Sequence, residues 1–152
     1  MPLRIFISYS TNDLAAANAI WTRLGSAGHA VYFAEVTARA GTRLPVELEQ
    51  QIKACDVFVV LWSQNAKESE WVSQEIGIAQ GANKEILPVI LEANLQAPGF
   101  IRDRKYLPAY QGFQQALDYL SHATAHHAEE KRKKEALLLL GLGVIILLAI
   151  SK

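Results

Sequence analysis

The stretch DVFVVLWSQNAKESEWVSQEIGIAQ, residues 56–80, contains a strand, a connection and a helix in immediate succession. Residues 56–62 are apolar almost without interruption, which is typical of a strand that is buried on both faces. In the segment 70–80, Val72, Ile76 and Ala79 recur at helical spacing and predict a stripe that faces the core. A doubly buried strand that leads into a helix is the repeating unit of a parallel α/β sheet.

The same two patterns recur on both sides of this stretch. Strands are predicted at 4–10, 30–33 and 85–91, with 106–110 as a candidate for a short fifth strand, and helices at 14–24, 44–55 and from 113 onward. We predict a core stripe of Leu14, Ala17, Trp21 and Leu24 in the first helix, and Pro45 in the first turn of the second. Residues 63–69 are predicted as a loop, and Pro88 indicates a strand near an edge of the sheet.

The composition excludes several classes of function. The 15 basic and 15 acidic residues cancel, and no basic stripe with interleaved aromatic residues suggests nucleic-acid binding. The single cysteine, Cys55, excludes an internal disulfide and is predicted to be a buried structural thiol. The three clustered histidines have no cysteine or acidic partner at a usual ligand spacing, so no metal site is expected; they are His122, His126 and His127.

Parallel α/β sheets bind ligands at the carboxyl ends of their strands. This rule selects three segments, which are 8–13, 34–43 and 62–71. Glu75 lies just beyond the third and shares a helix face with Trp71, four residues earlier. The first loop contains neither GxGxxG nor a Walker lysine, which argues against a classical nucleotide fold. Glu75 is therefore either a solvated residue at the edge of a core helix or a carboxylate held in a cleft.

Three motifs together resemble the Toll and interleukin receptor homology (TIR) domain in its bacterial form. FISYSTND (6–13) resembles the opening strand and loop of the family, and AEVTARAGTRL (34–44) stands where the family has its BB loop. LWSQNAKESEWVSQEI (61–76) resembles the family's most recognisable segment. The resemblance covers about residues 3–120 and implies a flavodoxin-like sheet of five parallel strands in the order 2-1-3-4-5.

Many members of this family cleave NAD⁺ at the nicotinamide ribosyl bond, while others are adaptors that only bind other TIR domains. The resemblance implies that Glu75 is the catalytic residue and that NAD⁺ is a substrate, with no separate cofactor. The residues that it places around the substrate are Phe33, Ser8, Ser10, Trp71, Ser63 and Arg39. Ser10 and Ser63 could instead cap helices, Phe33 and Trp71 could be packing residues, and Arg39 and Arg43 could be solvated loop charges. A carboxylate at the edge of a cleft would contribute little to stability.

The C-terminal part differs in composition from the rest. Residues 136–150 have no polar side chain and follow a charged stretch, so we divide the chain into a TIR domain (1–122), a charged linker or helix extension (123–135) and a transmembrane helix (136–150). The lysines and arginine at 131–134 place the TIR domain in the cytoplasm.

The sequence thus predicts a membrane-tethered NAD⁺ glycohydrolase that forms homo-oligomers through its TIR domains and acts in bacterial defence. Three alternatives stay open. They are a non-catalytic adaptor, an enzyme similar to nucleoside deoxyribosyltransferases, and a membrane-disrupting effector in which the TIR domain is the sensor.

Overall fold

The computed structural model of the protein describes residues 2–33, 45–96, 98–99 and 103–150. Its centre is a sheet of five parallel strands in the order β2-β1-β3-β4-β5. The strands are β1 (Arg4–Ser8), β2 (Ala30–Phe33), β3 (Val57–Trp62), β4 (Glu85–Ile90) and β5 (Leu107–Pro108). The predicted flavodoxin-like order is confirmed.

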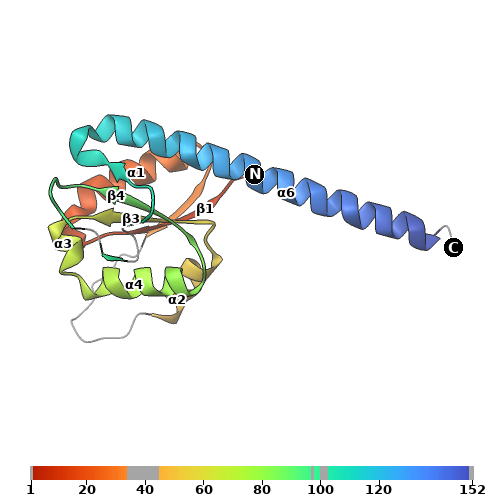
Figure 1. Cartoon of the computed structure of the whole chain (residues 1–152), viewed down its shortest axis with the longest axis horizontal. Helices are drawn as coiled ribbons and strands as arrows, with labels where there is room; N and C mark the ends of the chain where they lie inside the picture. The colour runs from red at the N-terminus through yellow and green to blue at the C-terminus, as the bar shows by residue number, and fades with distance from the viewer. Residues whose placement is uncertain (1, 34–44, 97, 100–102, 151–152) are drawn as a thin grey trace.

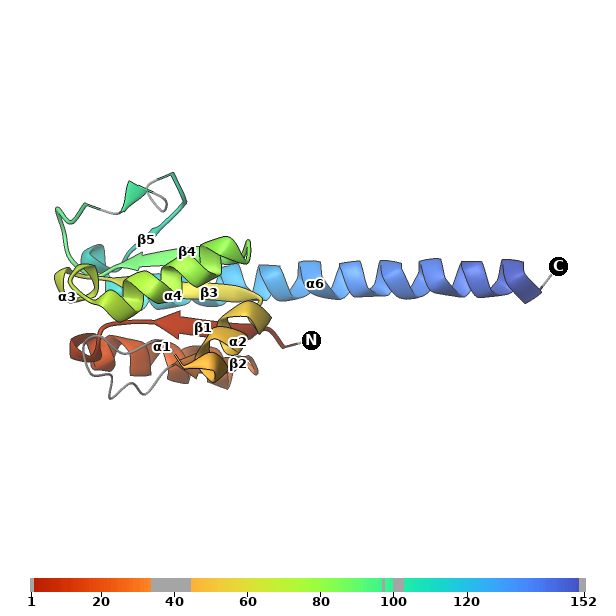
Figure 2. The ribbon, with the colours of Figure 1, turned by 90° about the horizontal axis from the view of Figure 1, so that it is seen from below.

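Helices cover both faces of the sheet (Figures 1 and 2). The α-helices are α1 (Leu14–Ser26), α2 (Val46–Ala54), α3 (Gln64–Lys67), α4 (Glu70–Gly81) and α6 (Phe113–Ile150), and the 3₁₀ turns are η1 (Thr11–Asp13) and η2 (Ala109–Gln111). Helices α1 and α6 lie on one face, and α2 and α4 lie on the other (Figure 1).

Alternation along the strands separates two cores. Ile5 and Ile7 of β1 pack with α1 and α6, whereas Phe6 of the same strand packs with α2 and α4. Strand β3 is buried at all six positions because its side chains lie alternately in the two cores, as the unbroken apolar run predicted. The predicted stripe of Val72, Ile76 and Ala79 in α4 is also confirmed.

The predicted stripe of α1 is wrong at two positions. Leu14 and Trp21 are exposed, Trp21 by 48%, while Ile20 is buried with Ala17 and Leu24. The buried stripe is therefore rotated by a fraction of a turn, since Ile20 lies three residues from Ala17 and four from Leu24.

Two connections also differ from the prediction. The segment 63–69, predicted as a loop, contains α3, because the Ser63 hydroxyl accepts a hydrogen bond from the Ala66 N–H at 3.0 Å and starts a helical turn. Pro45 precedes α2 at the N-cap position rather than lying in its first turn, and Cys55 is extended beyond the end of α2.

Strand β4 combines an interior position with an open edge. It pairs with β3 along its whole length, but β5 pairs only with Val89 and Ile90. The amino-terminal half of β4, up to Pro88, therefore has no strand partner on its outer side within the described residues. This agrees with the edge character that Pro88 predicted.

Helix α6 is a single element of 38 residues that runs from the domain through the charged stretch and into the apolar tail (Figure 2). Its first part packs on the sheet through Leu117 and Leu120, and farther along Lys131 approaches Asp56 at 3.1 Å. The distal part extends away from the sheet (Figure 1), and Leu137–Leu140 are each 67–70% exposed. Among the described residues, no helix meets the length and hydropathy needed to span a bilayer.

Candidate functional site

Ser8 and Glu75 lie on the same side of the sheet. Ser8 is the last residue of β1 and follows Phe6 in the alternation, so its side chain is on the face covered by α4. Glu75 is in the middle of α4, one residue before the buried Ile76. Both are buried, Glu75 with 4% of its surface exposed. The sequence left Glu75 as either a solvated residue at the edge of a core helix or a carboxylate in a cleft, and the structure shows it to be almost fully covered.

The environment of Glu75 favours its protonated form. Removal from water raises the pKa of the Glu75 carboxyl from 4.5 to about 7, and the Ser8 hydroxyl opposes this rise. No hydrogen bond of good geometry joins the two groups. Within the described part of the chain, neither Ser8 Oγ nor Glu75 Oε2 has a hydrogen-bond partner.

Two unpartnered polar atoms on one buried face are costly, because a desolvated donor or acceptor without a partner destabilises the fold by about 1–3 kcal/mol. A hydroxyl and a carboxylate can together hold the hydroxyl groups of a sugar, since the carboxylate accepts and the serine both donates and accepts. A carboxyl group with a pKa near neutrality is also a common feature of catalytic sites. Ser8 and Glu75 therefore form the candidate site.

Three serines near the carboxyl edge of the sheet cap helices. Ser10 accepts from Asn12 N–H at 3.4 Å, Ser63 caps α3, and Ser69 accepts from Val72 N–H at 3.3 Å. These bonds agree with the capping alternative for Ser10 and Ser63, whose contacts with a ligand stay predictions.

Asp13 is a residue of this edge that is not among the predicted site residues. Its carboxylate accepts a hydrogen bond from the Ser63 hydroxyl, which joins the end of η1 to the end of β3. The two residues are 50 positions apart, and no local pattern in the sequence indicates their contact.

The structure does not bring Phe33 together with Glu75. Phe33 packs on the α1 face, with its ring edge-to-face with Tyr9 at 5.4 Å and with Trp21 at 6.4 Å between centroids. Trp71 is partly buried and packs against the core under α4, which agrees with a packing function. The predicted roles of Arg39 and Arg43 fall on residues outside those that the structure describes.

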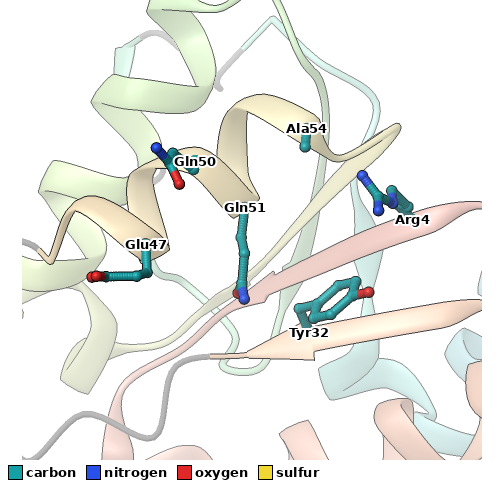
Figure 3. Close-up of a pocket in the computed structure, with 6 residues that line it drawn as sticks. All are labelled: Arg4, Tyr32, Glu47, Gln50, Gln51 and Ala54. Carbon is teal, nitrogen blue, oxygen red and sulfur yellow. The ribbon is translucent and has the colours of Figure 1, made fainter.

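A separate hollow of about 330 Å³ lies between α2 and the first two strands (Figure 3). It is lined by Arg4, Tyr32, Glu47, Gln50, Gln51 and Ala54. Gln51 reaches from α2 toward the strands, where Tyr32 lies (Figure 3). None of the predicted site residues that the structure describes lines this hollow.

The thiol of Cys55 is not a candidate nucleophile. Burial raises the pKa of the Cys55 thiol to about 11, which suppresses the nucleophilic thiolate and agrees with the predicted structural role. In the described ranges, no three His, Cys, Asp or Glu side chains gather in a way that could hold a metal ion.

Comparison with known proteins identifies the family. The TIR domain family matches residues 5–121. Over 110 residues the chain is 26% identical to the probable 2′ cyclic ADP-D-ribose synthase BdTIR of Brachypodium distachyon, an alignment that covers 68% of this chain and about half (49%) of that protein.

Two solved structures share the fold. The TIR domain of the Toll-related receptor TRR-2 from Hydra magnipapillata superposes with a TM-score of 0.60 and 17% identity, over 79% of this chain and 98% of that one. The CMP N-glycosidase BcmB of Clostridium botulinum gives a TM-score of 0.58 and 20% identity, also over 79% and 98%. With the family match spanning most of the chain and the strand order of the sheet in agreement, this protein belongs to the TIR domain family.

Proposed function

We propose that this chain is an NAD⁺ glycohydrolase that releases nicotinamide, with Glu75 as its catalytic residue. The observation that carries the proposal is the pair of buried, unpartnered atoms Ser8 Oγ and Glu75 Oε2 on one face of the sheet. The similarity to a protein named as a cyclic ADP-ribose synthase supports the same class of chemistry.

The reaction breaks the bond between C1′ of the ribose and the ring nitrogen of nicotinamide. Nicotinamide leaves with the bonding electrons and becomes neutral, while positive charge grows on C1′ and the ring oxygen of the ribose. Water then adds to C1′ and loses a proton, which gives ADP-ribose; attack by a hydroxyl of the same molecule would give a cyclic isomer instead.

Ionised Glu75 can assist this step in two ways. Its carboxylate can accept hydrogen bonds from ribose hydroxyls, and its charge stabilises the oxocarbenium-like transition state. Poor access of water strengthens the electrostatic attraction, because the effective dielectric constant around a buried group is low. Ser8 can hold a second sugar oxygen. A ligand that reaches Oε2 must first displace the side chains that cover Glu75, since only 4% of the residue is exposed.

The decisive experiment incubates the purified full chain with NAD⁺ and measures nicotinamide by chromatography. Glu75→Gln keeps the shape of the side chain and removes its charge, and it should lower the rate by at least about 100-fold. Glu70→Gln, which changes an exposed acid on the same helix, is the matched control and should retain the parental rate.

A parallel incubation with CMP tests the other N-glycosidic substrate that the fold comparison suggests. If cytosine is released from CMP and nicotinamide is not released from NAD⁺, the substrate is a nucleoside monophosphate rather than NAD⁺. Equal rates of nicotinamide release from parent and Glu75→Gln would contradict the assignment of Glu75.

We further propose that the chain associates with itself and is tethered to a membrane through the distal part of α6, with the TIR domain on the cytoplasmic side. The support is the exposure of Leu137–Leu140, four consecutive leucines that cover all sides of the helix with apolar surface. Bacterial origin and a role in defence stay predictions that rest on the sequence resemblance.

A further inference from the structure

A second hollow, of about 560 Å³, lies at the opposite end of the sheet from Ser8. It is lined by Glu85, Ile86, Leu87, Arg104, Lys105, Tyr119, His122, Ala123, His126 and His127. We call it the β4–α6 groove. It includes the amino-terminal half of β4, residues of α6, and the segment that leads into β5.

The groove exists because β5 is short. Since β5 pairs only with Val89 and Ile90, the described residues place no strand beside Glu85–Leu87. Instead Arg104 and Lys105, just before β5, line the space together with α6. Ile86 is buried in the core of the other face, and Leu87 packs against the core beneath α6, so the strand contributes a fixed part of the lining.

The charge of the groove is not neutralised from within. Arg104 and Lys105 make no ion pair or hydrogen bond with any described residue, and Glu85 is the one carboxylate among the described residues of the lining. Three imidazoles add ring N–H donors to the lining, and two of them, His122 and His126, are one helical turn apart. With two unpaired cations against one carboxylate among the described residues, the lining has the chemistry of an anion site.

The rest of the lining suits an aromatic group. Tyr119 is on α6, with 60% of the residue exposed, and Leu87 and Ala123 add apolar side chains to the same lining. An exposed aromatic ring beside paired cations can stack on a nucleobase while the cations hold phosphates. The volume is within the usual range of sites for small molecules.

We propose that the β4–α6 groove binds a nucleotide, with its phosphates on Arg104 and Lys105 and its base on Tyr119. The groove is separate from the Glu75 site, because its strand residues are at the amino ends of the sheet, whereas Ser8 is at a carboxyl end. The proposal therefore holds or fails independently of NAD⁺ cleavage.

The test is a titration of the full chain with ADP, followed by NMR of the imidazole protons. The chain has four histidines, of which three line the groove. The fourth, His29, lies before β2 and accepts a hydrogen bond from Leu3 N–H at 3.1 Å, so it reports on the integrity of the fold. ADP should shift the three groove signals with a Kd below about 1 mM and leave the His29 signal in place.

The paired substitution Arg104→Ala with Lys105→Ala should weaken ADP binding by roughly tenfold or more, because charge-assisted hydrogen bonds are lost. Lys133→Ala with Lys134→Ala removes the same charge from α6 outside the groove and should leave the affinity for ADP unchanged. Adenosine, which lacks phosphate, should bind more weakly than ADP.

Three results would overturn the proposal. The first is the absence of a shift of the groove histidines at millimolar ADP. The second is equal weakening by the two paired substitutions, which would indicate a general effect of charge. The third is a shift caused by vesicles that contain phosphatidylglycerol but not by ADP, which would assign the phosphate chemistry to a lipid headgroup.

Discussion

Glu75 should make the stability of the fold depend on pH in a direction opposite to that of most carboxylates. The folded protein holds the Glu75 proton up to a pKa of about 7, whereas the unfolded chain releases it at the ordinary value of 4.5. Between these values the folded state binds more protons than the unfolded state, so this group lowers the free energy of unfolding as pH rises. The full loss is about 3 kcal/mol, because a tenfold change in a protonation equilibrium corresponds to about 1.4 kcal/mol.

Glu75→Gln removes this titration and keeps a neutral side chain of the same shape. The difference in unfolding free energy, variant minus parent, should therefore rise by about 2–3 kcal/mol from pH 5 to pH 8.5. Urea denaturation followed by tryptophan fluorescence at several pH values measures that difference. The expectation revises the sequence-based one, in which a carboxylate at a cleft edge contributed little, because the group is almost fully buried.

Glu70→Gln supplies the matched control for this experiment. Glu70 is exposed in the first turn of α4, so its replacement should give a difference from the parent that stays constant between pH 5 and 8.5. A constant difference for Glu75→Gln as well would refute the burial argument, since it would mean that the Glu75 carboxyl group titrates alike in the folded and unfolded chains.

Three further predictions follow from the same structure. If ionised Glu75 acts on NAD⁺, kcat/KM should rise with pH through about 7. Ser8→Ala should move the midpoint of this pH profile upward, because the hydroxyl of Ser8 lowers the pKa of Glu75. A midpoint that Ser8→Ala leaves unchanged would contradict this. Cys55 should resist an aromatic disulfide reagent at pH 8 in the native protein and react at once in urea, and rapid native labelling would be inconsistent with its raised pKa and burial. Leu139→Arg together with Ile146→Arg should move the protein from the membrane fraction to the soluble fraction, because the two arginines raise the free energy of membrane insertion by roughly 5–7 kcal/mol at full central depth. A parent chain that is already soluble as a monomer would rule out the tether.

The sequence predicts most elements because they rest on patterns within one segment. The apolar run of β3 and the stripe of α4 are such patterns, and the TIR resemblance supplied the order of the strands. The position of α3 was missed because one hydroxyl, that of Ser63, starts the turn. The choice between Trp21 and Ile20 as the buried residue of α1 depends on how α1 is rotated against the sheet, which a helical period alone does not fix.

The sequence predicts Glu75 as a candidate site residue but does not predict its burial. The motif around Glu75 marked the residue, yet its 4% exposure depends on how α4 packs against α2 and the sheet, which a local motif does not show. The face of the sheet on which Phe33 lies depends on the register between β1 and β2. Phe33 pairs with Ile7 of β1, and both side chains lie on the α1 side. Asp13 and Ser63 meet through strands that are distant in sequence, so no spacing rule could have joined them.

The unbroken run of α6 ties the rotation of its far end to the domain. A rigid α-helix turns by about 100° for each residue, so one residue inserted between Lys131 and Leu137 would swing the distal end about a quarter of a turn around the axis. Seven inserted residues would lengthen the arm by about 10 Å and restore its direction to within about 20°. The rotation of the TIR domain relative to a partner bound at Leu137–Leu140 therefore depends on the number of residues between Lys131 and Leu137. A series of one- to seven-residue insertions would show this as a periodic dependence.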